Sequence, residues 1–214
     1  MPPFIILSYV VLADRFREPT RDILFAFFVG VLIIIPAGIL NEFFIWQNDN
    51  PDNFTFIAGF TEESCKWICL YQIIKRVEFD EPMDAIVYGV TISLGFATLE
   101  NFDYVFFLEE DMSWDDSLVI AAVRAISAIP MHGLCGVIMG YYLGIHCFTN
   151  KGHYIFQAIA IPMGFHALYN YLVDNEQSIY LLLILFMLGY AKILHNKIKA
   201  VQLLKKSEEE YKFR

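Results

Sequence analysis

Residues 22–46 read DILFAFFVGVLIIIPAGILNEFFIW, and this stretch decides the class of fold. No polar side chain occurs between Asp22 and Asn41. About 20 helical residues cross a bilayer core about 30 Å thick, so the stretch is long enough to span a membrane. Pro36 and Gly38 do not exclude a helix, because membrane helices tolerate both where neighbouring helices satisfy the freed backbone groups. We therefore expect a membrane-spanning helix here.

The composition of the whole chain supports the same conclusion. Of its 214 residues, 57% are hydrophobic and 18% are charged, and the mean hydropathy is +0.49. Soluble domains carry about 25% charged residues, so a soluble globular protein is excluded. The net charge of −9 excludes a protein that binds nucleic acid, because it would repel the phosphate backbone. The four cysteines lie in apolar runs, which indicates packing rather than a disulfide framework.

The apolar runs along the chain predict an all-α fold, a polytopic transmembrane helix bundle of about seven spans. The first run is too short to span comfortably. The fifth is overlong with Pro130 in its middle, where we expect a kink or a tilt. We expect one domain over residues 1–198, followed by a cytoplasmic C-terminal tail over residues 199–214. The predicted spans are about 3–13, 22–46, 54–74, 83–107, 117–147, 153–173 and 178–197.

The distribution of basic residues predicts the orientation in the membrane. All but two of the 15 Lys and Arg residues follow the first, third or fifth segment or lie in the C-terminal end. The intervening loops, 47–53, 108–116 and 174–177, contain none. Because positively charged loops stay in the cytoplasm, this alternation predicts an odd number of spans, with the N-terminus outside and the C-terminus inside.

The two remaining cations, Lys66 and Arg124, lie inside predicted spans. A charged side chain at mid-bilayer costs about 2.5–3.5 kcal/mol on insertion scales, so such residues are rare without a function. A shared interior site in which they pair with acids offsets that cost; the alternative is that they only hold the bundle together. The polar residues that accompany them in the spans are Glu62, Glu63, Glu100, Asp103, His132, His166 and Asn170.

The depths of these residues indicate a single site. At 1.5 Å per helical residue, Glu62 and Glu63 lie about 12–14 Å below the outer end of their segment. Glu100 and His166 each lie about 10–12 Å from an outer end, and His132 about 22 Å. Glycines at four-residue intervals follow His132, which predicts a close helix contact. We expect the site in the outer half of the membrane.

This set of side chains suits hydrolysis by either of two routes. A carboxylate in a poorly hydrated pocket can take a proton from water, while imidazole and amide groups stabilise the oxyanion that forms. Alternatively, Glu and His side chains form a first shell for Zn²⁺ that leaves a position for water. No Ser or Cys lies at a spacing from a base that predicts a covalent nucleophile, and the HExxH motif is absent.

Four motifs follow one another along the chain. Residues 62–66 read EESCK, an EExxK motif, and residues 96–104 read FATLENFDY, an FxxxENxxY motif. Arg124 is followed by His132, and residues 166–170 read HALYN, an HxxxN motif. In these motifs, and in residues 14–19 (DRFREP), the chain resembles the PrsW-type intramembrane proteases. That family is distantly similar to the CAAX-processing glutamate proteases and to the scaffold subunit of gamma-secretase.

The resemblance implies a bacterial or archaeal endopeptidase that is a multi-pass protein of the cell membrane. Characterised relatives cut a single-pass anti-sigma factor on its extracellular side, so the implied partner is a single-pass membrane protein substrate. The roles implied by motif are the water-activating base for Glu62 and Glu63, positioning of the water or a metal for Glu100 and His132, and oxyanion donors or ligands for His166 and Asn170.

The resemblance leaves the mechanism open between a glutamate-activated and a metal-activated water. In the metal-dependent case, with a divalent metal such as zinc as cofactor, the expected ligands are Glu63, Glu100, His132 and His166. Two other classes of protein also use buried charges: a small proton-coupled transporter, for which an inverted repeat is missing, and a non-catalytic scaffold that binds transmembrane helices. Only the protease should lose function on Glu63→Gln at unchanged expression.

Overall fold

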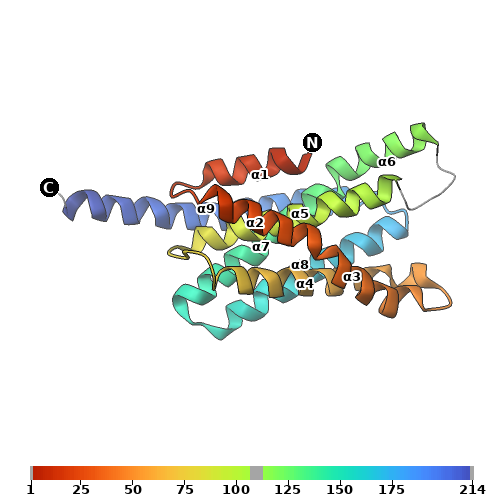
Figure 1. Cartoon of the computed structure of the whole chain (residues 1–214), viewed down its shortest axis with the longest axis horizontal. Helices are drawn as coiled ribbons and strands as arrows, with labels where there is room; N and C mark the ends of the chain where they lie inside the picture. Colours follow the sequence, from red (N-terminus) through yellow and green to blue (C-terminus); the bar gives the residue numbers. More distant parts are fainter. Residues whose placement is uncertain (1, 107–112, 213–214) are drawn as a thin grey trace.

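The chain folds as a bundle of helices (Figure 1). The computed structural model describes residues 2–106 and 113–212, with side chains described up to Gln202. These residues contain no strand, which confirms the predicted all-α fold. Residues 107–112, at the end of the predicted fourth span and in the predicted loop 108–116, lie outside the described part. The elements are α1 (Pro2–Ala13), α2 (Thr20–Leu32), α3 (Ile34–Asn41), the π-helical turn η1 (Glu42–Trp46), the 3₁₀ helix η2 (Pro51–Ile57), α4 (Ala58–Ile73), α5 (Pro82–Phe106), α6 (Trp114–Ile126), α7 (Ala128–Thr149), α8 (Gly152–Asp174) and α9 (Tyr180–Lys212).

Within the described residues, four helical stretches are long and apolar enough to cross a membrane, and α1 is a shorter apolar helix. The chain is therefore a membrane protein. The predicted spans 54–74 and 153–173 correspond to α4 and α8, which carry Glu62, Glu63, His166 and Asn170 and are not among the four. The count of seven spans and their orientation stay predictions. The four stretches are Thr20–Trp46, Pro82–Phe106, Trp114–Thr149 and Tyr180–Gln202.

Two predicted spans are broken by proline. α2 ends at Leu32 and α6 ends at Ile126, each four residues before a proline, Pro36 and Pro130. The proline ring collides with the carbonyl group four residues earlier and has no N–H to donate, so the regular helix stops there. The predicted span 117–147 is therefore not one kinked helix but two helices that meet at Ser127. The expected bend is present, one turn before Pro130.

The core of the bundle is the first part of α5, in which every residue from Met83 to Ala97 is buried. α7 packs directly against it through the predicted glycine repeat. A Cβ atom added at Gly136 would lie 2.6 Å from the carbonyl oxygen of Gly89, and one at Gly140 would overlap the carbonyl oxygen of Ala85. The two backbones therefore touch, as the four-residue repeat predicted.

We expect Gly140→Ala to lower the free energy of unfolding by about 1–3 kcal/mol, because the new methyl group must push α5 away from α7. Alanine alone favours a helix over glycine, so the control is Gly164→Ala in α8, where an added Cβ meets nothing within 4 Å. Thermal unfolding in detergent should show a lower midpoint for Gly140→Ala only. Equal midpoints for the two variants would contradict the close contact.

The last helix continues beyond the predicted end of the domain at residue 198. α9 runs from Tyr180 to Lys212 without a break. Gln202, in the predicted tail, is buried and donates hydrogen bonds to Asp14 and Glu81. The first residues after 198 are thus part of the packed structure.

Candidate active site

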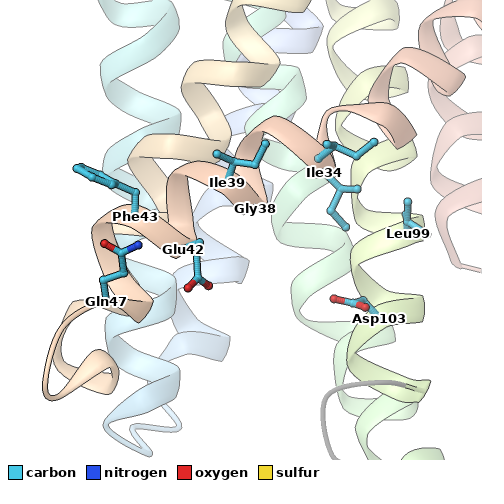
Figure 2. A pocket seen from close by; sticks show the side chains of 9 residues that line it. Ile34, Gly38, Ile39, Glu42, Phe43, Gln47, Leu99 and Asp103 are labelled. Atoms are coloured by element: carbon cyan, nitrogen blue, oxygen red, sulfur yellow. The ribbon is translucent and has the colours of Figure 1, made fainter.

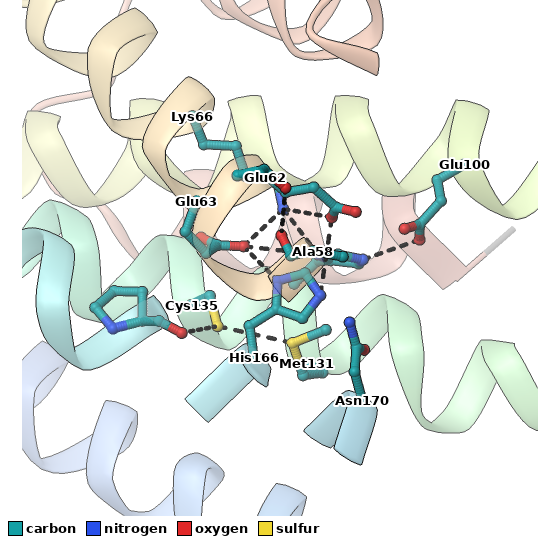
Figure 3. A network of polar contacts seen from close by, with 12 residues as sticks. Ala58, Glu62, Glu63, Lys66, Glu100, Met131, Cys135, His166 and Asn170 are labelled. Atoms are coloured by element: carbon teal, nitrogen blue, oxygen red, sulfur yellow. Dashed lines mark hydrogen bonds and ion pairs between the residues drawn. The ribbon is translucent and has the colours of Figure 1, made fainter. Parts of the chain in front are cut away.

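α4 contributes two acids, Glu62 and Glu63, and one cation, Lys66, all on adjacent faces of the helix. Glu63 and Lys66 are fully buried, and the Lys66 Nζ lies 2.7 Å from Glu63 Oε1. The second acid, Glu62, lies 3.8 Å from the same ammonium through Oε2. Lys66 therefore contacts both acids, and its contact with Glu63 is the shorter. All three side chains point into the interior of the bundle (Figure 3).

His166 of α8 joins the two glutamates. Its Nδ1 lies 2.9 Å from Glu63 Oε1, and its Nε2 lies 3.8 Å from Glu62 Oε2. Gly59 makes this approach possible, because a Cβ atom there would overlap the backbone nitrogen of Ala167. Glu63 is an acceptor when ionised, so Nδ1 carries the proton and Nε2 presents its lone pair toward Glu62.

His132 connects this group to α5 and α6. Its Nδ1 lies 3.0 Å from the Lys66 Nζ, and its Nε2 lies 3.0 Å from Glu100 Oε2. An ammonium group can only donate, so Nδ1 accepts and the Nε2 proton is donated to Glu100. Glu100 also receives a hydrogen bond of 2.6 Å from Arg124, whose Nε donates to Asn101 at 3.0 Å. Arg124 lies in the last turn of α6, directly before the break at Ser127, and reaches Glu100 from there.

Asn170 lies at the edge of the group rather than within it. Its Nδ2 donates a hydrogen bond of 3.3 Å to the backbone carbonyl of Thr55 in η2. A residue that we did not predict, Asn41, donates to Glu62 Oε1 at 3.2 Å and accepts from Thr61. Asn41 comes from the end of the apolar stretch 22–46, and nothing in its spacing relates it to α4. Only the packing of α3 against α4 brings it to the site.

Three residues of the site form a donor set of the zinc type, in which a metal would replace the Lys66 ammonium as the partner of His132 Nδ1. Glu62, His132 and His166 each offer one ligand atom, and the three atoms lie within 4.8 Å of one another. Glu62 Oε2 is buried and has no hydrogen-bond partner in the described structure. Two imidazoles and one carboxylate form a donor set that zinc uses in hydrolytic sites. No other His, Cys, Asp or Glu joins this group of three in the described part of the chain.

The sequence predicts Glu63 and Glu100 as the carboxylate ligands, and the geometry favours Glu62 in that place. Glu63 and Glu100 instead each hold the far ring nitrogen of one histidine, His166 and His132. Metal-ligating histidines usually donate their second N–H to a carboxylate in this way, which fixes the ring and its tautomer. The adjacent glutamates of α4 thus meet opposite ring nitrogens of His166: Glu63 lies beside Nδ1 and Glu62 lies beside Nε2.

Residues 18–193 match the sequence profile described as "PrsW family intramembrane metalloprotease". The chain belongs to the PrsW family. The protein named Protease PrsW of Bacillus subtilis is 33% identical over 182 residues, which cover 80% of this chain and 79% of the relative. That of Oceanobacillus iheyensis is 33% identical over 193 residues (87% and 86%), and that of Clostridioides difficile 29% over 212 residues (93% and 87%). No solved structure matches the chain well enough to count as similar.

The PrsW family assignment makes the chain a protease and confirms the resemblance seen in the four motifs. In this PrsW protease the polar group opens into a cavity of about 450 Å³ between α3, α4, α5, α6, α7 and α8. Glu62, His132 and His166 line it, together with Asn170. The cavity reaches the carboxylates of Glu62 and Glu100, whereas Glu63 lies behind its wall.

A second cavity, of about 710 Å³, continues from the first between α3 and α5. Its walls are apolar side chains from α3, with Glu42 and Asp103 facing one another across it (Figure 2). Ile35, Ile39 and Phe43 on this side are more than half exposed. The opening therefore faces sideways, toward the surface that lipid would cover.

Proposed function

We propose that this chain hydrolyses a peptide bond of a single-pass membrane protein, an anti-sigma-factor-like substrate, near the outer face of the cell membrane. The proposal places a divalent metal between Glu62, His132 and His166. The observation that carries it is the grouping of Glu62 with two imidazoles within 4.8 Å, each imidazole being hydrogen-bonded to a different carboxylate, Glu63 or Glu100. A zinc ion bound there would act as a Lewis acid toward the scissile carbonyl and promote ionisation of water.

Glu63 is the proposed general base. Its Oε1 is occupied by Lys66 and His166, while its Oε2 is buried without a hydrogen-bond partner in the described structure. That free oxygen can take the proton from the attacking water and return it to the leaving amine. The ammonium of Lys66, 2.7 Å from Oε1, limits the cost of keeping this carboxylate charged inside the bundle.

Asn170 is the proposed oxyanion donor. It lines the cavity, and its only described hydrogen bond is the 3.3 Å contact to Thr55. An amide N–H aimed at the developing oxyanion stabilises the tetrahedral intermediate. His166, the alternative donor in the sequence prediction, acts in this proposal as a ligand.

The opening between α3 and α5 is the proposed route for the substrate helix. Gly38 lies on its α3 wall, and an added Cβ meets nothing within 4 Å, so a large side chain fits there without disturbing the fold. We expect Gly38→Trp to lower kcat/KM for a membrane-embedded substrate at least about tenfold, a loss of about 1.4 kcal/mol.

Two controls isolate the effect of Gly38→Trp. Gly189→Trp in α9 also enters open space but lies away from the route, so it should leave cleavage unchanged. A short soluble peptide with the same cut site should be cleaved equally well by both variants. Unchanged cleavage of the membrane-embedded substrate by Gly38→Trp would exclude this route.

The substrate and the side of cleavage are tested by reconstitution. The purified chain and a tagged single-pass substrate are combined in liposomes, and the cut is mapped by mass spectrometry of both fragments. A cut within the outer half of the substrate helix or just outside it supports the proposal. A cut on the cytoplasmic side would contradict the predicted orientation, and binding of the substrate without any cut would favour the scaffold alternative.

A further inference from the structure

Three acids gather at a second place in the bundle, far along α5 from the polar group described above. Asp14 follows α1, Glu18 lies in the connection to α2, and Asp84 lies in the first turn of α5. One carboxylate oxygen from each lies within 4.8 Å of the others. We call these three residues the acidic cluster. The connections that carry it and the second half of α9 meet at the same end of the bundle (Figure 1).

Two of the three acids in the cluster are buried and Glu18 is half-buried, and no ion pair to them occurs among the described side chains. Asp14 and Asp84 are 3% and 0% exposed. No Lys, Arg or His side chain of the described residues lies within ion-pair distance of Asp14, Glu18 or Asp84. Burial away from water raises the pKa of the Asp14 and Glu18 carboxyl groups. Three acids packed in this way repel one another unless a cation or protons neutralise them.

The existing hydrogen bonds hold the cluster in position but leave oxygens free. Asp84 Oδ2 accepts from the backbone N–H groups of Asp80 and Glu81, each at 3.0 Å, and Asp14 Oδ1 accepts from Phe16. The other oxygens, Asp14 Oδ2 and Asp84 Oδ1, are buried without a hydrogen-bond partner in the described structure. One carboxylate oxygen of each aspartate is thus fixed by hydrogen bonds from the protein, and the second is free to bind a ligand.

A fourth group points to a ligand independently of the acids. Gln202 of α9 is 2% exposed and donates through Nε2 to Asp14 Oδ1 at 2.9 Å and to Glu81. Its amide oxygen, Oε1, is buried beside the cluster and has no hydrogen-bond partner in the described structure. Because Nε2 is fixed by carboxylates, the acceptor oxygen stays inside, where none of the described side chains donates to it.

We propose that the acidic cluster, with Gln202, binds a hard divalent cation, magnesium or calcium, that ties α1, α5 and α9 together. Every available donor is an oxygen, from carboxylates and one amide, and this is the donor set that Mg²⁺ and Ca²⁺ prefer over zinc. The bound cation satisfies the free oxygens of Asp14, Asp84 and Gln202 and cancels the repulsion between the acids. It links the connection after α1, the start of α5 and the second half of α9, and so stabilises their packing.

The test uses Mn²⁺ as an EPR probe on the full-length chain in detergent, stripped with chelator. All variants are made in a background chain that carries Glu62→Gln and His166→Ala. These two substitutions remove two of the three ligands proposed for the active-site metal and make the result independent of proteolysis. We expect one class of saturable Mn²⁺ sites, displaced by Mg²⁺ or Ca²⁺, and the better competitor identifies the physiological ion. Asp14→Asn and Asp84→Asn should each weaken binding by about tenfold or more, because affinity follows the charge of the ligands. Asp49→Asn, an exposed acid in the η1–η2 connection, should bind like the background.

Thermal unfolding of the otherwise unsubstituted chain gives a second measurement. Added Mg²⁺ or Ca²⁺ should raise the midpoint of the unsubstituted chain but not that of Asp84→Asn. In chelator, Asp84→Asn should unfold no earlier than the unsubstituted chain, since one repelling charge is gone. Absence of saturable Mn²⁺ binding, or binding by Asp14→Asn and Asp84→Asn as tight as that of the background chain, would overturn the proposal and leave shared protons as the means of neutralising the cluster.

Discussion

A Glu63→Gln chain is expected to cleave its substrate about 10²–10⁴-fold more slowly than the unsubstituted chain while still holding its metal, because the general base is lost and the ligands are not. Glutamine preserves the shape of the side chain, and its amide oxygen can still accept from Lys66. Glu63→Ala is less informative, since it leaves the fully buried ammonium without its 2.7 Å partner and destabilises the fold. The measurements are the cleavage rate and the metal content of the same preparation.

The matched control for this prediction is Glu78→Gln, an exposed glutamate in the connection between α4 and α5. It should retain both cleavage and metal. Cleavage by Glu63→Gln at the unsubstituted rate would remove Glu63 from the chemistry. Loss of metal together with activity would instead make Glu63 a ligand, as the sequence analysis of the zinc route predicts.

The second large effect is expected at the neighbouring glutamate. Glu62→Gln should purify with little metal and show no measurable cleavage, because a neutral amide replaces the one anionic ligand of the proposed group. The chain should remain folded, since the amide oxygen can still accept the 3.2 Å hydrogen bond from Asn41. His166→Ala should lose metal in the same way.

The contrast between Glu62 and Glu63 is the informative result. Metal content by mass spectrometry of the purified chains, with thermal unfolding as the check on folding, separates the two roles. Stoichiometric metal in a folded Glu62→Gln chain would show that Glu62 is not a ligand, and the proposed allocation would then be wrong.

Much of the fold and the site follows from sequence alone, because charged and polar residues are rare inside membrane-spanning helices and mark the positions that need partners. Lys66 and Arg124 in apolar segments required acidic partners, and the structure pairs them with Glu63 and Glu100. The glycine repeat after His132 predicted a close helix contact, and the structure shows that α5 is the partner. These inferences depend on the free-energy cost of burying a charge and on the space between two helices, and both follow directly from the residue types.

The remaining features depend on how helices are placed relative to one another. The breaks at residues 33 and 127 lie one turn before a proline, so Pro36 and Pro130 indicated them only approximately. Which histidine nitrogen each of Glu62 and Glu63 meets depends on the rotation of α4 against α8, and adjacent residues of a helix cannot be separated by spacing alone. Asn41 reaches Glu62 through packing between helices that no motif relates.

In the proposed mechanism, Glu62, His132 and His166 would hold the metal that activates water. The most direct test measures the zinc content of the detergent-purified chain and, on the same sample, cleavage of a single-pass substrate before and after treatment with a chelator. We expect stoichiometric zinc, loss of cleavage on chelation, and recovery of cleavage when zinc is restored. Cleavage that continues at full rate in metal-free protein would contradict it and would assign the reaction to a glutamate-activated water.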